Sequence, residues 1–270
     1  MHRLLTVFAL GLLSGCALYH GPVNPKFPVT EEMAQADQRR MQADPKPLAR
    51  PVVVIGSYRG PDPIVEAMTI ELARMTTGER DDFLRIPTWF DGDIDKIAEK
   101  TVELVDNRWP VDAQGFENKT REVDVVGLSM GGLAARYAAD QLEGRRLKIN
   151  RLITIATPHR GAIAAEGSPL IEDTAIVDMY RRSLFLTKLD EAYKGDYEII
   201  PYARLDDRIV GTINTAPPGR WPIWTNSARF TSHLTINEDR RILTDVARRL
   251  RGEEPRGEEG EPLPSSELGE

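Results

Sequence analysis

The stretch VVGLSMGGLAARYA, residues 125–138, places a serine between glycines at the point where an apolar run gives way to an alanine-rich one. The β-branched residues before Ser129 favour a buried strand, and the alanines after it favour a helix. The pattern Gly127-x-Ser129-x-Gly131 is typical of a sharp strand-to-helix turn, because glycines two residues from the serine leave room for strand and helix to pass. Such a turn pushes the serine hydroxyl above the edge of a sheet. Ser129 is then either a nucleophile or an ordinary small residue at this connection, and the rest of the sequence has to supply a base, an acid and an oxyanion site.

Short apolar runs alternate with amphipathic segments across residues 51–251. The expected strands cover residues 51–57, 83–90, 121–129, 151–157, 197–205 and 222–230. The expected helices cover residues 62–76, 93–109, 130–142 and 237–252. This alternation predicts an α/β domain with a mainly parallel central sheet and helices on both faces. The exception is the stretch 161–196, which is helix-prone and contains no clear strand.

Two further stretches accompany the serine turn. ITIATPHRGA, residues 153–162, runs from a strand into a Thr-Pro-His-x-Gly segment, and VVVIGSYRG, residues 52–60, runs from the first strand into a glycine-containing loop. With these, residues 51–251 resemble the α/β-hydrolase superfamily, specifically its lipase and serine esterase branch. The resemblance implies a Ser–acid–His triad and an α/β-hydrolase fold, with 161–196 as a helical cap or lid insertion.

The resemblance also guides the choice of a general base among the four histidines. His2 and His20 lie in the N-terminal region, outside the expected domain. His159 occupies the position of the non-catalytic histidine in Thr-Pro-His-x-Gly segments. His233 follows the last expected strand and precedes the final helix, where the family carries its catalytic histidine. His233 is therefore the predicted base.

The triad acid should follow the penultimate strand. The segment YARLDDRIVG, residues 202–211, offers Asp206 and Asp207 there. The frame Asp-x-(Ile/Val)-Val that is common in the family fits Asp207, which makes it the favoured acid. Asp206 is the alternative, and it could equally be a turn residue or an ion-pair partner.

An oxyanion site needs main-chain N–H groups beside the nucleophile. The resemblance implies that Met130, the residue after the serine, supplies one of them. The second is expected from Ser57 or Tyr58 in the loop after the first strand. In this loop the sequence departs from the family, because Ile55-Gly56 stands where His-Gly is usual. Because the donor is a main-chain N–H, it does not depend on the side chain at position 55. Either Ser57 or Tyr58 can supply it.

The N-terminus carries a different signal. Arg3 precedes an apolar run over residues 4–13, which is too short to span a bilayer and is typical of a signal sequence. Leu-Ser-Gly-Cys follows and ends at Cys16, the only cysteine, so residues 1–15 resemble the signal peptide of bacterial lipoproteins. That resemblance implies acylation at Cys16 and a membrane anchor. Ala17 is not the aspartate of inner-membrane retention, which favours the outer membrane, facing the periplasm.

The segments that flank the domain differ from it in composition. Residues 16–50 are proline-rich and polar, so we expect an acylated N-terminus and a tether that includes a short helix near 31–42. Residues 252–270 hold seven Glu against one Arg and contribute −6 of the formal net charge of −7. Few apolar residues offset the entropy of ordering this tail, which predicts disorder.

The leading interpretation is a serine hydrolase that cleaves a carboxylic ester, lipid-like in view of the resemblance and the anchor, through an acyl-enzyme. Two alternatives are acyl transfer to an acceptor other than water, and a catalytically silent scaffold that binds envelope partners. The scattered basic residues argue against nucleic-acid binding. The sequence shows no metal-ligand motif and calls for no cofactor.

Overall fold

The computed structural model describes residues 22–90, 92–111, 118–168, 173–228 and 231–263. In this part of the chain a six-stranded sheet has the order β2-β1-β3-β4-β5-β6, and every pairing is parallel. The strands are β1 Val52–Ile55, β2 Phe83–Ile86, β3 Val123–Leu128, β4 Ile149–Ile155, β5 Glu198–Arg204 and β6 Ile223–Thr225. The helices are α1 Glu31–Ala43, α2 Asp62–Met75, α3 Ile94–Arg108, α4 Met130–Asp140, α5 Ile163–Glu166, α6 Thr174–Asp178, α7 Leu184–Ala192 and α8 Arg240–Leu250. The predicted parallel α/β architecture is confirmed.

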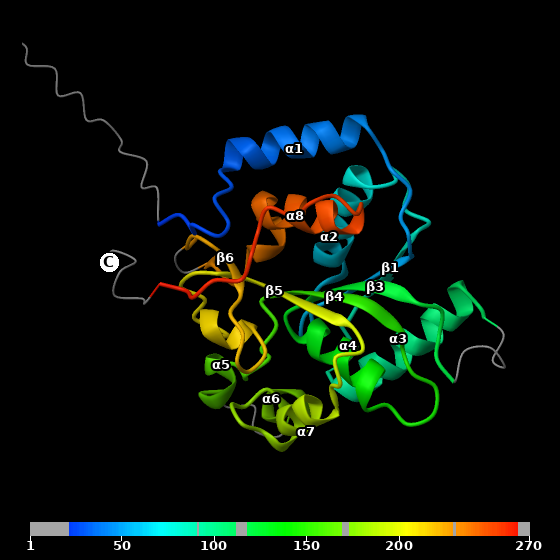
Figure 1. Cartoon of the computed structure of the whole chain (residues 1–270). Coiled ribbons are helices and arrows are strands. Elements are labelled where there is room, and N and C mark those ends of the chain that lie inside the picture. The colour runs from blue at the N-terminus through cyan, green and yellow to red at the C-terminus, as the bar shows by residue number, and fades with distance from the viewer. Residues whose placement is uncertain (1–21, 91, 112–117, 169–172, 229–230, 264–270) are drawn as a thin grey trace, which may run out of the picture.

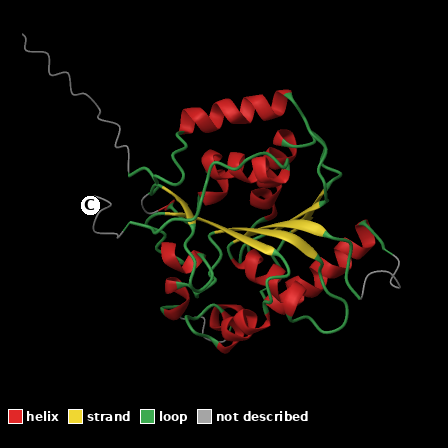
Figure 2. Cartoon of the chain, in the orientation of Figure 1, coloured by secondary structure: helices red, strands yellow, loops and turns green. Residues whose placement is uncertain are grey.

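Helices cover both faces of the sheet, so its central strands are buried on both sides (Figures 1 and 2). Alternate residues of β1 point to opposite layers: Val53 and Ile55 pack with α3 and α4, whereas Val52 and Val54 pack with α1, α2 and α8. Runs of valine and isoleucine suit strands that are buried on both faces. This two-sided burial explains why the strands appear in the sequence as continuous apolar runs.

The order of the strands locates the functional edge of the sheet. From β1 the chain crosses to β2 on one side and then returns to β3 on the other side of β1. In open parallel sheets a ligand binds beyond the carboxyl ends of the strands, where the winding direction changes. Ser57 follows β1 and Ser129 follows β3, so both lie at this point.

Within the stretch 161–196, the described residues 161–168 and 173–196 form three short helices, α5, α6 and α7, between β4 and β5. They lie beyond α4, on the side of the sheet away from α1 (Figure 1). The Tyr137 and Phe185 rings stack with centroids 5.8 Å apart, and Arg136 forms an ion pair with Asp190 at 2.8 Å. The helical insertion is therefore packed onto α4 through both apolar and charged contacts.

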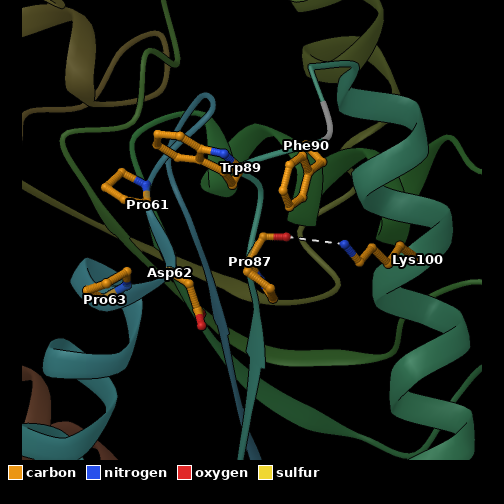
Figure 3. A pocket seen from close by; sticks show the side chains of 7 residues that line it. All are labelled: Pro61, Asp62, Pro63, Pro87, Trp89, Phe90 and Lys100. Atoms are coloured by element: carbon orange, nitrogen blue, oxygen red, sulfur yellow. Dashed lines mark hydrogen bonds between the residues drawn. The ribbon is translucent and has the colours of Figure 1, made fainter.

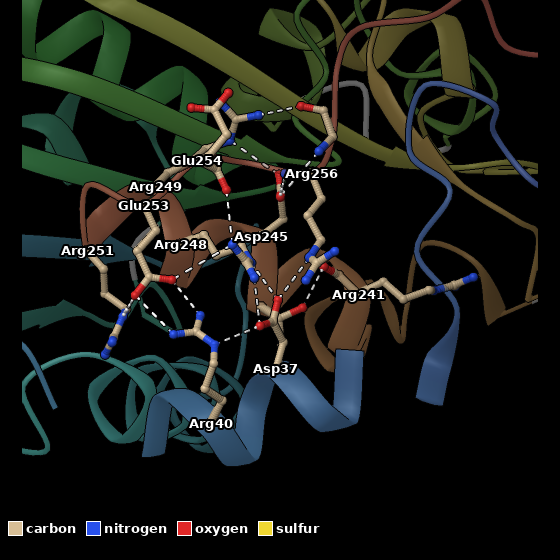
Figure 4. A network of polar contacts seen from close by, with 12 residues as sticks. Asp37, Arg40, Arg241, Asp245, Arg248, Arg249, Arg251, Glu253, Glu254 and Arg256 are labelled. Carbon is tan, nitrogen blue, oxygen red and sulfur yellow. Dashed lines mark hydrogen bonds and ion pairs between the residues drawn. The ribbon is translucent and has the colours of Figure 1, made fainter. Parts of the chain in front are cut away.

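Both ends of the described chain converge on α8. Asp37 of α1 accepts hydrogen bonds from Arg248 of α8, at 2.5 and 2.7 Å, and from Arg256 beyond it, at 3.1 Å (Figure 4). Glu253 forms ion pairs with Arg40 of α1, at 2.5 Å, and with Arg251, at 2.8 Å. Part of the expected tether is thus a helix held against the domain by a network of charges.

The predicted disorder of residues 252–270 is wrong for residues 252–263. This segment lies against the domain, and the buried Asp245 carboxylate accepts hydrogen bonds from the backbone N–H groups of Arg256, at 2.6 Å, and Gly257, at 3.3 Å. The Trp224 indole donates to the carbonyl of Glu261 at 3.1 Å. The prediction considered only the apolar surface that the segment could bury. The segment is instead held by hydrogen bonds to polar groups of the domain. Residues 264–270 lie outside the described residues.

The apolar run 4–13 and Cys16 also lie outside the described residues. Among the helices that the structure does describe, none has the length and apolar character needed to cross a membrane.

Candidate active site

Ser129 sits on the tight turn between β3 and α4, with φ 50° and ψ −122°. Non-glycine residues rarely adopt positive φ, and such strain persists only where the surroundings hold it. Here the Ser129 N–H donates to the carbonyl of Ile155 at 2.8 Å, and the Ser129 carbonyl accepts from the Thr157 hydroxyl at 2.7 Å. Residues at the end of β4 therefore clamp the serine in its strained conformation.

The glycines around the serine are required by close backbone contacts. A Cβ atom on Gly127 would lie 2.6 Å from the backbone nitrogen of Gly132, and one on Gly131 would lie 2.5 Å from the carbonyl oxygen of Gly56. Real Cβ atoms essentially never come within 3.0 Å of another heavy atom. The second contact also shows that the first turn of α4 lies directly against the carboxyl end of β1.

His233 reaches the serine from a loop that follows β6. Its Nε2 lies 3.2 Å from the Ser129 Oγ, although 104 residues separate the two in sequence. The neighbouring Ser232 anchors the loop, because its buried hydroxyl donates to the carbonyl of Leu205 at 2.8 Å and accepts from the Ala228 N–H at 2.9 Å. The predicted base is thus held within hydrogen-bonding distance of the predicted nucleophile.

Asp207 completes the hydrogen-bonded chain. Its Oδ2 accepts from the His233 Nδ1 at 2.8 Å, and its Oδ1 accepts from the N–H groups of Ile209, at 3.0 Å, and Val210, at 2.9 Å. Because a buried carboxylate only accepts, this contact requires a proton on the His233 Nδ1 and turns Nε2 toward the Ser129 hydroxyl. Asp206, by contrast, forms an ion pair with Arg208 at 3.0 Å. The structure therefore brings Asp207, rather than its neighbour, to the histidine.

The predicted oxyanion donors lie on adjoining segments. Met130 is the first residue of α4, so its N–H has no acceptor within the helix. The loop after β1 lies beside it and closes as a tight turn, in which the Gly60 N–H donates to the Ser57 carbonyl at 2.9 Å. The Thr88 hydroxyl donates to the same carbonyl. This arrangement fixes the backbone of Ser57 and Tyr58 next to the start of α4.

His159 lies away from this chain of residues. It is fully buried, with Nδ1 3.3 Å from the Arg136 guanidinium and Nε2 3.0 Å from the Thr154 hydroxyl. Burial and the adjacent Arg136 lower the pKa of His159 well below its ordinary value, so the ring is neutral at pH 7. Because arginine only donates, Nδ1 is the acceptor and Nε2–H donates to Thr154. His159 therefore links β4 to α4, and its position agrees with a non-catalytic role.

A buried polar cluster that includes Thr235, two residues after His233, was not anticipated from the sequence. The Asp239 carboxylate accepts from Arg204 at 2.8 Å, from Thr225 at 2.9 Å and from Arg241 at 2.6 Å, while Arg204 also donates to Thr235 at 2.7 Å. Burial raises the pKa of Asp239, but hydrogen bonds and charge from Arg241 and Arg204 outweigh it and lower the pKa to about 2. The cluster ties β5, β6 and α8 together around the histidine loop. Its sequence signal was Asp239 immediately before α8, a typical N-cap position.

A cavity of about 390 Å³ opens beyond the ends of β1 and β2 (Figure 3). Its lining residues are Pro61, Asp62, Pro63, Pro87, Trp89, Phe90 and Lys100. The Lys100 side chain reaches from α3 and donates to the Pro87 carbonyl at 3.3 Å. Trp89 is 52% exposed and Phe90 is 92% exposed. The cavity contains no member of the Ser129 chain, but Pro61 directly follows the Ser57–Gly60 loop and Thr88 binds that loop.

Within the residues placed by the structure, no group of three or more His, Cys, Asp or Glu side chains is arranged to hold a metal ion.

Comparison with known proteins agrees with this architecture. Residues 94–193, which run from α3 to the end of α7, match the family described as "PGAP1-like alpha/beta domain". The product of the Listeria innocua gene lin2722 superposes with a TM-score of 0.50 at 15% identity, over 74% of this chain and 92% of that one. The mature Bacillus licheniformis lipase BlEst2 has the same TM-score and identity, over 75% of this chain and 94% of that one. No curated protein matches the sequence. The sheet, its helices and these structural neighbours together show that the chain has the α/β-hydrolase fold.

Proposed function

We propose that this protein is a serine hydrolase that cleaves carboxylic esters. The observation that carries the proposal is the hydrogen-bonded chain from Ser129 through His233 to Asp207, built on a strained turn at the carboxyl edge of the sheet. A serine is a weak nucleophile on its own and needs an adjacent base, which in turn needs a group to orient it. All three roles are filled by buried or nearly buried side chains from separate loops.

In this mechanism the Nε2 of His233 takes the proton of Ser129 as the Oγ attacks the ester carbonyl carbon. Asp207 stabilises the imidazolium that forms. The N–H group of Met130 and that of Ser57 or Tyr58 bind the developing oxyanion. His233 then gives its proton to the departing alcohol, and a water molecule attacks the acyl-enzyme with His233 again acting as the base.

The substrate that fits this site best carries an apolar group, as a lipid-like ester does. The cavity bordered by three prolines, Trp89 and Phe90 begins where the proposed oxyanion loop ends. In the proposed binding mode the apolar chain runs from the reacting carbonyl past this loop into the cavity, where its removal from water favours binding by about 25 cal/mol per Å² of apolar surface. The insertion 161–196 is the proposed cap over the same edge.

A lipid anchor at Cys16 would bring the domain to such substrates, on the periplasmic side of the outer membrane. This part of the proposal depends on the N-terminal sequence alone. Mass spectrometry of the mature N-terminus tests it, because acylation and cleavage before Cys16 predict a modified cysteine as the first residue.

The decisive test of the proposed reaction replaces the nucleophile. Ser129→Ala should lower kcat for p-nitrophenyl butyrate by about 10⁵-fold or more, because the remaining groups supply no nucleophile. A fluorophosphonate should label the wild-type protein rapidly, and peptide mapping should find the label on Ser129, with all other serines as internal controls. Unchanged turnover in Ser129→Ala, or labelling of a different serine, contradicts the proposal.

A further inference from the structure

Two side chains of the loop after β1 converge on one carboxylate in the helical insertion. The Tyr58 hydroxyl donates to Asp173 Oδ2 at 2.6 Å, and the Arg59 guanidinium donates to the same oxygen at 3.0 Å. The Arg59 guanidinium also lies 5.4 Å from the centroid of the Tyr58 ring. Asp173 is 115 residues away from Tyr58 in sequence, so the contact joins two separate parts of the fold.

The other oxygen of Asp173 has a different task. Oδ1 accepts from the N–H groups of Ala175, at 3.1 Å, and Ile176, at 3.4 Å, and so caps the N-terminus of α6. The carboxylate is only 12% exposed. The two oxygens thus divide their roles, because one holds the insertion in shape while the other binds the loop. Asp173 therefore does more than cap α6, because its second oxygen binds the loop after β1.

The loop that Asp173 binds is strained. Arg59 has φ 44°, in the left-handed region, which costs a residue with a Cβ about 1 kcal/mol. The turn is closed on one side by the Gly60 N–H and the Thr88 hydroxyl, both of which donate to the Ser57 carbonyl. On the other side the side chains of Tyr58 and Arg59 are held by Asp173. Without the second restraint, the loop keeps the two hydrogen bonds to the Ser57 carbonyl and the packing of the Tyr58 ring, but the Arg59 side of the turn loses its ion pair.

We propose that Asp173 is a positioning residue, which holds the Ser57–Gly60 loop so that its backbone N–H points at the oxyanion. The inference rests on the proposed ester hydrolysis. Oxyanion donors act on charge that exists only in the transition state, and small displacements weaken them steeply. Asp173 touches no substrate in this scheme and acts through Tyr58 and Arg59.

The contact should persist over the working pH range of an esterase. Burial and the hydrogen bond to Asp173 raise the pKa of Tyr58 to about 12, so its hydroxyl remains a donor well above neutral pH. The rate loss caused by breaking the contact should therefore be the same at pH 7 and pH 9. A loss that came from altered protonation of the triad would change across this range.

The test uses the full chain with Asp173→Asn and Tyr58→Phe. Asparagine keeps the acceptor that caps α6 but turns an amide donor toward the loop. The Arg59 guanidinium only donates and loses its partner, whereas the Tyr58 hydroxyl can turn to accept from the amide. Tyr58→Phe removes only the hydroxyl. Each change should lower kcat for p-nitrophenyl butyrate, counted per site titrated by fluorophosphonate, by about tenfold, with KM changed less than twofold. The double variant should lose less than the product of the two single losses, because both changes act on the same cluster of Tyr58, Arg59 and Asp173.

Glu166→Gln is the matched control. Glu166 pairs with Arg181 at 2.6 Å in the same insertion and lies outside the proposed site, so its loss should leave kcat within twofold. A purely structural role for Asp173 predicts fewer titratable sites with unchanged kcat per site. If kcat per site stays within twofold of wild type in both Asp173→Asn and Tyr58→Phe, the inference is overturned while the Ser129 mechanism stands. If the wild-type serine does not react with the fluorophosphonate, the proposed function itself fails and the inference with it.

Discussion

The replacement Asp207→Asn tests the proposed triad through the orientation of a single amide. In the wild type, Oδ1 accepts from the N–H groups of Ile209 and Val210, and Oδ2 accepts from His233. An asparagine can keep its oxygen on the two backbone donors, which turns its NH₂ group toward His233. The opposite orientation would place the NH₂ group against both backbone N–H groups.

The cost of the second orientation decides between them. Leaving a buried donor without a partner costs about 1–3 kcal/mol, so losing both backbone hydrogen bonds costs about 2 kcal/mol or more. The NH₂ group therefore faces the Nδ1 of His233, which must then accept. The imidazole proton moves to Nε2, so this atom can no longer accept the proton of Ser129. We expect kcat to fall by about 10³–10⁴-fold, equivalent to about 4–5.5 kcal/mol in the barrier.

The assay is steady-state hydrolysis of p-nitrophenyl butyrate at pH 7, with thermal unfolding to show that Asp207→Asn remains folded. Asp206→Asn is the matched control: it removes the neighbouring carboxylate, which pairs with Arg208, and should leave kcat within threefold. A kcat for Asp207→Asn within tenfold of wild type, or an equal loss in Asp206→Asn, refutes the assignment of the acid.

Two further predictions concern stability and substrate binding. Because the pKa of Asp239 falls from its ordinary value of 3.8 to about 2 on folding, its carboxylate stabilises the fold above pH 4, and this contribution, roughly 2 kcal/mol, is lost as the pH falls toward 2. Urea unfolding at pH 6 and 2.5 should show the stability difference between wild type and Asp239→Asn shrinking by about 1.5 kcal/mol, because part of the contribution persists until the pH falls below the folded-state pKa. A constant difference would contradict this prediction. Trp89→Ala should raise KM for p-nitrophenyl octanoate about tenfold, because losing roughly 55 Å² of buried apolar surface weakens binding by about 1.4 kcal/mol. KM for p-nitrophenyl acetate should change little. Trp221→Ala, which alters an exposed tryptophan before β6, is its control, and equal effects of Trp89→Ala on both esters would exclude the cavity as the acyl site.

Local patterns in the sequence account for most of the sheet. Every predicted strand has a counterpart, because strands buried on both faces must be continuously apolar. The ends are less predictable: β2 stops at Ile86 although the predicted strand continues to Phe90, and Pro87 follows immediately. Proline has no N–H to donate to a neighbouring strand. Trp89 and Phe90 are thereby released from the sheet and border the cavity instead.

Polar contacts between distant segments leave much weaker traces in the sequence. The tail 252–263 looks disordered by composition, yet Asp245 binds its backbone from the adjacent helix. Asp173 looks like an ordinary N-cap, and only the fold shows Tyr58 and Arg59 on its second oxygen. In both cases the partners are far apart in sequence or lie in a segment without periodicity. Hydrogen bonds between such groups leave no local sequence pattern from which they could be predicted.

The sequence by itself determined the alternation of strands and helices, the strained turn at Ser129 and the short list of residues able to act with it. Those features are local, since they depend on side-chain volume, periodicity and the glycine spacing around one turn. Only the tertiary structure placed Asp207 rather than Asp206 against His233, placed His233 3.2 Å from Ser129 and joined the first loop to Asp173. The physical reason is that parallel strands bring their carboxyl ends to one edge, where loops distant in sequence meet, and the separations there depend on how the whole domain packs.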